Sequence, residues 1–166
     1  TNFVLEKMIT DHMSFEDALS LAQKLGYAEK DPTADVDGID ACRKICILSS
    51  LIYGKHVYPE SVQTTGIRNV SLEDVASADK LGYAVKLIAS VTQMSDGKIL
   101  PIVTPMLIPY SNLLSHVNDV FNAVMVWGDA IDKTMFYGRG AGKFPTASAV
   151  MGDIINCAQH RNTVLS

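Results

Sequence analysis

Charged side chains gather in one stretch, from Gly26 to Lys44, which reads GYAEKDPTADVDGIDACRK. It holds five carboxylates and three cations around a proline, and we expect a helix from about Val36. In such a helix Asp40 and Lys44 project from one face, with Cβ atoms about 5–6 Å apart. A lysine oriented by a carboxylate can transfer a proton or stabilise an oxyanion. The stretch therefore predicts a site for a small polar ligand, such as an amine or a hydroxyl.

Further acidic side chains precede this pair, and some could point at the same ligand: Glu29, Asp31, Asp35 and Asp37. A plainer interpretation stays open, because a lysine and an aspartate four residues apart are often a solvated pair contributing about 0.2–0.5 kcal/mol. Acidic residues before a helix also complement its positive end. A calcium loop is excluded, since it needs a glycine sixth and a glutamate twelfth. Counted from Asp31, those positions hold Val36 and Cys42.

Several segments resemble the homoserine dehydrogenase family. From Ala22 to Lys44 the spacing A-x3-GYAE-x-DP-x2-DV-x-GID-x3-K resembles the family signature. Further segments follow in the family's order: TNFVLEKM, SFEDALSLAQKLGYAE, TTGIRNVSLEDVASADKLGYAVKLIA, NAVMVWGD and GRGAGKFPTASAVMGDI. The resemblance covers nearly the whole chain, and several ordered motifs match by chance far less often than a single one.

This resemblance implies NAD(P)-dependent interconversion of L-homoserine and L-aspartate 4-semialdehyde in threonine, methionine and isoleucine biosynthesis. It implies that Asp40 and Lys44 are the catalytic pair. Glu29 and Asp35 would bind polar groups of the substrate, with Glu29 on the amino group. Tyr27 would line the pocket. A lysine ordinarily has a pKa near 10.4, so we expect the catalytic lysine to act as an acid in aldehyde reduction, and the reverse step to need a second group.

No G-x-G-x-x-G fingerprint of a Rossmann domain occurs near the start of the chain. By resemblance, residues 1–166 are a single substrate-binding and catalytic domain, with the NAD(P)-binding domain outside this chain. We expect the chain to be inactive alone.

The GRGAG segment, whose spacing is G-x-G-x-G, is the second candidate site. Its glycines let backbone N–H groups approach an anion at the start of a helix. By resemblance, this loop closes over cofactor and substrate. The candidate cofactor-binding residues are Gly138, Gly140, Ala141 and Gly142. A tight turn between a hairpin and a helix is the alternative.

Composition indicates an ordered protein that does not bind nucleic acid. The 166 residues are enough for a substantial core, and 48% hydrophobic with 19% charged residues argues against disorder. A net charge of −4 and a pI near 5.5 disfavour nucleic acid. No apolar run reaches the roughly 18 residues needed to span a bilayer, and no signal peptide is evident. We expect a soluble, cytoplasmic protein.

The cysteines and histidines carry no predicted chemistry. Cys42, Cys46 and Cys157 fit small core residues better than a disulfide framework or a zinc site. The histidines stand singly along the sequence, at His12, His56, His116 and His160. We assign no metal ligands, because the family's monovalent cation site maps to the very start of this chain or upstream of it. Lys86 also matches the family, but we treat it as structural.

Periodicity and turn signals predict an α+β fold, with a mixed, largely antiparallel sheet and helices packed on one face. We expect helices over residues 2–12, 14–26, 40–53, 71–81 and 146–161, and strands over 83–93, 99–108, 122–127 and 134–137. Asp96-Gly97 marks the first hairpin. The prolines at 101, 105 and 109 favour an edge or irregular strand there. An uncovered sheet face would suit a homodimer.

Two functions from other classes remain open. The chain could be a non-catalytic amino-acid-binding domain that uses Glu29, Asp35 and Lys44 without hydride transfer. It could also serve chiefly as a dimerisation domain.

Overall fold

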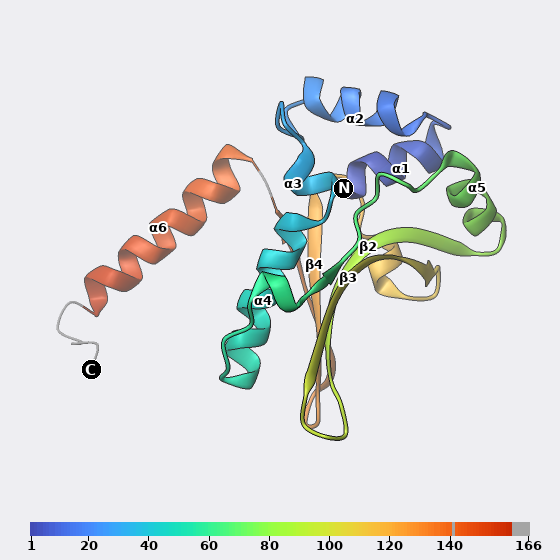
Figure 1. Cartoon of the computed structure of the whole chain (residues 1–166). Helices are drawn as coiled ribbons and strands as arrows, with labels where there is room; N and C mark the ends of the chain where they lie inside the picture. Colours follow the sequence, from blue (N-terminus) through green and yellow to red (C-terminus); the bar gives the residue numbers. More distant parts are fainter. Residues whose placement is uncertain (141, 161–166) are drawn as a thin grey trace. The chain divides into compact units, whose positions relative to one another are not determined.

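The computed structural model describes residues 1–140 and 142–160 (Figure 1). The chain divides into two compact units, Thr1–Asp119 and Val120–Ser166, which we call unit 1 and unit 2. Each unit is described by itself. Candidate residue Ala141 and the predicted helix end at residue 161 lie outside the described residues.

Unit 1 contains most of the helices. Their bounds are α1 Asn2–Thr10, α2 Phe15–Lys24, α3 Thr33–Val36, α4 Ile39–Tyr53 and α5 Leu72–Lys80, with 3-10 turns η1 Pro59–Ser61 and η2 Leu113–His116. The Ser71 side chain accepts a hydrogen bond from the Asp74 N–H. The Asp74 carboxylate accepts one from the Ser71 N–H, and the two bonds form the capping box of α5. Gly54 ends α4 with a φ of 63°. These predicted helices are confirmed, whereas the four-residue α3 was not predicted.

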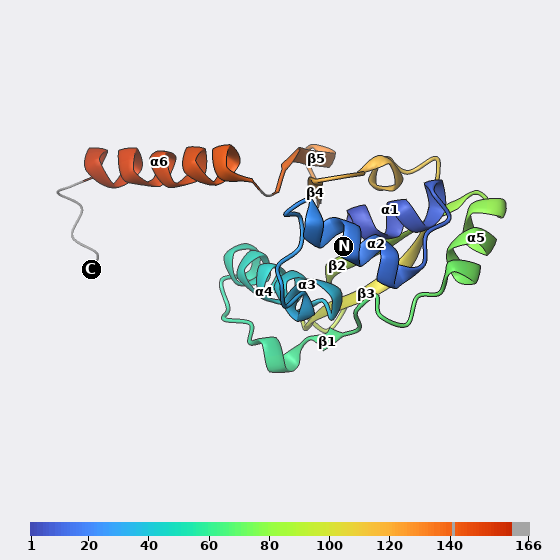
Figure 2. The ribbon, with the colours of Figure 1, turned by 90° about the horizontal axis from the view of Figure 1, so that it is seen from above.

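Unit 1 also contains a three-stranded sheet, in the order β1-β3-β2 (Figure 2). Its strands are β1 Gln63–Thr64, β2 Tyr83–Gln93 and β3 Ile99–Pro109. The antiparallel β2–β3 hairpin confirms the prediction. The expectation of an edge strand over 99–108 is wrong, because the two-residue β1 pairs in parallel with the other side of β3.

The prolines are compatible with this central position because of their register. The Thr65 N–H donates to the Val103 carbonyl, so Val103 directs its backbone polar groups toward β1. Pro101 and Pro105 lie two residues to either side of it, and backbone directions alternate along a strand. The nitrogens of these two prolines therefore face the β1 side of β3, at positions that the two-residue β1 does not pair. The hydrogen bonds between β2 and β3 lose no N–H donor to these prolines.

The core of unit 1 lies between the helices and one face of the sheet. Val85 and Leu87 of β2 pack with residues of α1, α2 and α5. Val103 of β3 and Ala89 of β2 pack with residues of α4. Figure 1 shows α1 between α2 and strand β2. The α+β class with helices on one sheet face is thereby confirmed.

Unit 2 consists of a hairpin and one long helix. Strands β4 Phe121–Gly128 and β5 Asp132–Arg139 pair antiparallel, which confirms the second predicted hairpin, and α6 follows at Lys143–Gln159. The helix starts three residues before the predicted Thr146, so that Pro145 falls within the first turn, where its missing N–H costs no helical hydrogen bond. No described residue of unit 2 is buried, and apolar side chains such as Phe144 and Ile154 are exposed.

Candidate active site

Asp40 and Lys44 form the predicted pair on α4. Gly38, with a φ of 77°, lets the chain turn from α3 into α4. Asp40 then falls in the first turn and Lys44 one turn later, with Lys44 Nζ 2.7 Å from Asp40 Oδ2. Both side chains keep access to solvent, 61% for Lys44 and 47% for Asp40. The predicted contact is present, and its catalytic role stays a prediction.

The start of α1 brings this pair together with Asp35. The side chains of Asp35, Asp40 and Lys44 all lie close enough to the backbone nitrogen of Thr1, at the start of α1, to act on it electrostatically. Three of the predicted site residues therefore lie in the neighbourhood of the beginning of α1.

Tyr27 lies beside the same turn, whereas Glu29 does not join the group. The Tyr27 ring meets the Phe3 ring edge-on, with centroids 5.2 Å apart. Gln23 Nε2 donates to the Glu29 backbone carbonyl at 3.0 Å and fixes the loop through the main chain. Over residues 1–140 and 142–160, no hydrogen bond or ion pair joins the exposed Glu29 carboxylate to Asp35, Asp40 or Lys44.

The spacing of residues along the sequence could not predict that the start of α1 lies near Asp35, Asp40 and Lys44. The segment TNFVLEKM belongs to the family resemblance, but nothing in its residue types links Thr1 to Asp35 or Lys44. Only the fold brings residue 1 to residues 35–44. The site is also more open than the predicted cavity, because the Asp40 and Lys44 side chains keep much of their access to solvent.

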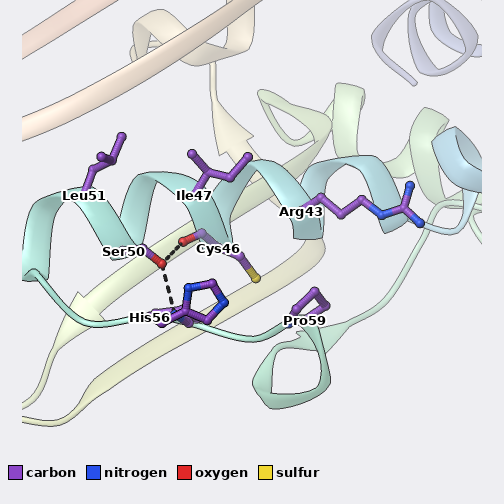
Figure 3. A pocket seen from close by; sticks show the side chains of 8 residues that line it. Arg43, Cys46, Ile47, Ser50, Leu51, His56 and Pro59 are labelled. Carbon is purple, nitrogen blue, oxygen red and sulfur yellow. Dashed lines mark hydrogen bonds between the residues drawn. The ribbon is translucent and has the colours of Figure 1, made fainter. Parts of the chain in front are cut away.

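A hollow in the described residues lies elsewhere on α4 (Figure 3). It has a volume of about 480 Å³ and is lined by Arg43, Cys46, Ile47, Ser50, Leu51, His56, Val57 and Pro59. In Figure 3 the Cys46 thiol points toward the segment that carries His56 and Pro59. Ser50 Oγ donates to the Cys46 carbonyl at 2.7 Å and accepts from the Val57 N–H at 3.0 Å. This hollow contains none of the predicted site residues.

The glycine segment of unit 2 has the backbone character expected of an anion-binding loop. A side chain at Gly140 would overlap the Asn122 amide, so the main chain must run close to Asn122 there. Gly142 precedes α6 with a φ of 118°, and no side chain caps this helix. The N–H groups of its first turn are thus open to an anion. These features fit the phosphate of a nucleotide.

Lys86, which the sequence led us to treat as structural, is buried beside the segment that follows η2. Its side chain is only 5% exposed, and its Nζ donates to the Val117 carbonyl at 2.7 Å and to Asn118 Oδ1 at 2.8 Å. Burial lowers the pKa of Lys86, and the nearby Glu6 carboxylate opposes this shift. Lys86 therefore ties the segment before Asp119 to β2, a structural role within unit 1.

We expect Lys86→Met to lower the free energy of unfolding by about 1–3 kcal/mol at neutral pH, because it leaves a buried carbonyl without a donor. The pH dependence should change too. The pKa of Lys86 is lower in the folded protein than the 10.5 of the unfolded chain. At pH values between the two, the unfolded chain holds a proton on Lys86 that the folded protein has released, so the free energy of unfolding of the wild type rises with pH. This gain is lost as the pH falls through the folded pKa. Urea unfolding from pH 7 to 10.5 checks both effects, and an identical pH slope in Lys86→Met would contradict the second.

In the part of the chain that the structure describes, no three or more His, Cys, Asp or Glu side chains are grouped so that they could hold a metal ion. None of the described helices has the length and apolar character required to cross a membrane.

Sequence comparison identifies close relatives. Residues 1–155 match the family model for homoserine dehydrogenase. A homoserine dehydrogenase of Synechocystis sp. is 50% identical over 159 residues, which cover 94% of this chain and 37% of that protein. A homoserine dehydrogenase of Bacillus subtilis is 46% identical over 155 residues, covering 93% of this chain and 36% of that protein.

Solved structures agree with these matches. The S. aureus homoserine dehydrogenase at pH 7.5 has a TM-score of 0.89 and 44% identity, covering 99% of this chain and 40% of that one. A hyperthermophilic archaeal homoserine dehydrogenase in complex with NADPH has a TM-score of 0.76 and 34% identity, covering 100% of this chain and 46% of that one. The chain thus spans less than half the length of its relatives. Because the family match extends over residues 1–155, this chain belongs to the homoserine dehydrogenase family.

Proposed function

We propose that this chain is the substrate-binding and catalytic part of a cytoplasmic homoserine dehydrogenase. The whole enzyme interconverts L-homoserine and L-aspartate 4-semialdehyde with NAD(P), as a step in threonine, methionine and isoleucine biosynthesis. The observation that carries the proposal is the Asp40–Lys44 ion pair, held beside Asp35 at the start of α1.

The substrate explains why these side chain types stand together. Homoserine has an ammonium and a carboxylate at one end and a hydroxyl at C4. Asp35 supplies a carboxylate for a polar group of the substrate, Glu29 one for the amino group, and Lys44 a cationic donor for the C4 oxygen. Tyr27 lies at the edge of the site with its ring held by Phe3.

Lys44 acts as the acid in the direction of aldehyde reduction. Its ammonium donates a hydrogen bond to the C4 oxygen, stabilises the negative charge that develops there, and delivers the proton that makes the hydroxyl. Asp40 holds the ammonium in place at 2.7 Å. Oxidation of homoserine runs the same path backwards, so Lys44 must first lose its own proton before it accepts the hydroxyl proton, and we assign that prior deprotonation of Lys44 to a second group outside this pair.

The glycine segment fits the nicotinamide cofactor. Gly142 and the first turn of α6 would bring backbone N–H groups to a phosphate of the nucleotide. Gly138 and Gly140 would shape the approach to it, because Gly138 pairs with Asn122 in the hairpin and the Gly140 N–H donates to the Val120 carbonyl at 3.1 Å. The nucleotide, when bound, exchanges the hydride with C4 of the substrate. The candidate Ala141 belongs to the same segment and stays a prediction.

Part of the sheet face opposite the helices suits a second copy of the chain. Ile88, Ile102 and Met106 lie on the face opposite the helices, by their register in β2 and β3, and belong to neither core cluster. Apolar side chains on an uncovered sheet face favour association. We therefore propose a homodimer through this face, which would serve the enzyme and not replace its catalytic role.

A turnover assay of the full-length protein tests the proposed function. L-homoserine with NAD⁺ or NADP⁺ should give the semialdehyde, followed by the absorbance of the reduced nicotinamide. L-serine, which has a hydroxyl one carbon closer to the ammonium, is the matched control and should react at least about 100-fold more slowly, because misplaced reacting atoms lose the benefit of orientation. Absence of turnover with homoserine under both nucleotides would contradict the proposal, and it would favour a non-catalytic binding domain.

A further inference from the structure

The segment after β1 lies between the sheet and the loop that carries Asp35. The Thr65 N–H donates to the Val103 carbonyl of β3 at 2.7 Å, and the Ile67 N–H donates to the Val36 carbonyl of α3 at 2.7 Å. The segment is therefore hydrogen-bonded on one side to the sheet and on the other to the last residue of α3. We call residues 64–68 the brace.

Gly66 permits this close approach. A Cβ on Gly66 would overlap the Val36 carbonyl oxygen and the Asp37 Cα, which are main-chain atoms that cannot move aside. The φ of Gly66 lies outside the left-handed region, so proximity and not backbone conformation requires glycine here. Any larger residue would push the brace and the α3 loop apart.

Arg68 makes the polar contact at the end of the brace. Its Nε pairs with the Asp37 carboxylate, and its guanidinium also donates to Thr33 Oγ1 at 3.4 Å. Thr33 in turn donates to Asp31 Oδ1 at 2.6 Å. The guanidinium thus contacts the residues at both ends of α3, with Asp35 between them.

The α3 loop needs such support because it is too short to hold its own shape. A helix of four residues is unstable in isolation. Val36 and Ile67 are both buried in the core of unit 1, and Gly38 lies against Thr64 and Val103. The brace therefore fixes the position of Asp35 on one side of Gly38 and of Asp40 on the other.

We propose that Gly66 and Arg68 are positioning residues that hold Asp35 against the substrate, an inference that rests on the proposed function. The Arg68–Asp37 pair is about half exposed, so it contributes little to global stability. Its effect lies in orientation, since a displacement of about 1 Å in a site can cost up to about 100-fold in rate.

Arg68→Met and Arg68→Lys in the full-length protein test this inference. Arg68→Met should raise the KM for L-homoserine about tenfold, with kcat within about threefold and the KM for the nicotinamide nucleotide unchanged. Arg68→Lys keeps a cation near Asp37 and should restore part of the affinity. Asp37→Asn should match Arg68→Met, and the double variant should be no worse than either single variant, since both remove the same contact.

Lys98→Met is the matched control, because it breaks an exposed ion pair with Asp96 at a hairpin turn outside this region, and its KM should equal that of wild type. An unchanged homoserine KM in both Arg68→Met and Asp37→Asn, with only a lower melting temperature, would overturn the inference and leave Arg68 a structural residue. Failure of the proposed function looks different, because it appears as absence of homoserine turnover in the wild-type protein with either nucleotide, so that no homoserine KM can be measured for any variant.

Discussion

Lys44→Ala in the full-length protein should lower kcat for homoserine oxidation and for semialdehyde reduction by about 10²–10⁴-fold, the usual contribution of a positioned acid or base. The loss follows because alanine offers neither a proton nor a positive charge to the C4 oxygen. Folding should change little, since Lys44 is 61% exposed and an ion pair of this kind contributes at most about 1 kcal/mol. Steady-state kinetics and thermal unfolding measure the two effects separately.

Lys7→Ala provides the matched control for this variant. Lys7 pairs with Asp11 at 3.0 Å with the same spacing of four residues, on α1. Its removal should leave kcat within about twofold of wild type, as expected for a surface ion pair. Lys44→Arg separates the two roles of the ammonium, because arginine keeps the charge but does not release a proton. Near-wild-type turnover in Lys44→Ala would contradict the assignment of Lys44.

Residues 1–166 alone should show no detectable reduction of L-aspartate 4-semialdehyde with NADPH, whereas the full-length protein turns over. The chain spans less than half the length of its relatives, and we assign to the nucleotide only the glycine segment before α6. Without a nucleotide held against the substrate, the advantage of bringing two reactants together is lost, which can amount to about 7–11 kcal/mol of the barrier. A stopped assay at high protein concentration checks this, with circular dichroism confirming the folded state. Measurable turnover would show that the cofactor is bound mainly by this chain.

The same sample tests the proposed dimer. Sedimentation velocity of residues 1–166 should show a species of twice the 18.0 kDa chain mass, because the apolar Ile88, Ile102 and Met106 lie on the sheet face opposite the helices of unit 1. Replacing Ile102 by Lys should convert it to the monomer. A strict monomer at all concentrations would contradict association through this face.

The helices and hairpins of this chain could be predicted because their signals are local. Ser71 and Asp74 form the capping box that their spacing predicts, and Asp96-Gly97 joins β2 to β3. The α3 turn and β1 have only four and two residues, too few for any periodicity to appear. The central position of β3 was not predicted for the same reason, because it depends on the pairing with β1.

In the candidate site, too, the contacts within one helix could be predicted and the contacts between distant segments could not. The contact between Asp40 and Lys44 follows from helical spacing alone and could be predicted. The proximity of Thr1 to Asp35 and Asp40 could not be predicted, nor could the contacts of Arg68 with Asp37. Each of these joins residues more than thirty positions apart in the sequence. The assignment of Glu29 to the substrate rests on the resemblance alone and stays a prediction, because within the described part of the chain its carboxylate has no contact with the Asp40–Lys44 pair.

A crystal structure of the full-length protein with L-homoserine and the oxidised nucleotide tests the central claim most directly. We predict that Lys44 Nζ lies about 2.7–3.2 Å from the C4 hydroxyl oxygen, within hydrogen-bond distance, and that the Asp35 carboxylate contacts the same molecule. A bound homoserine whose hydroxyl faces another residue, with Lys44 directed into solvent, would contradict the account.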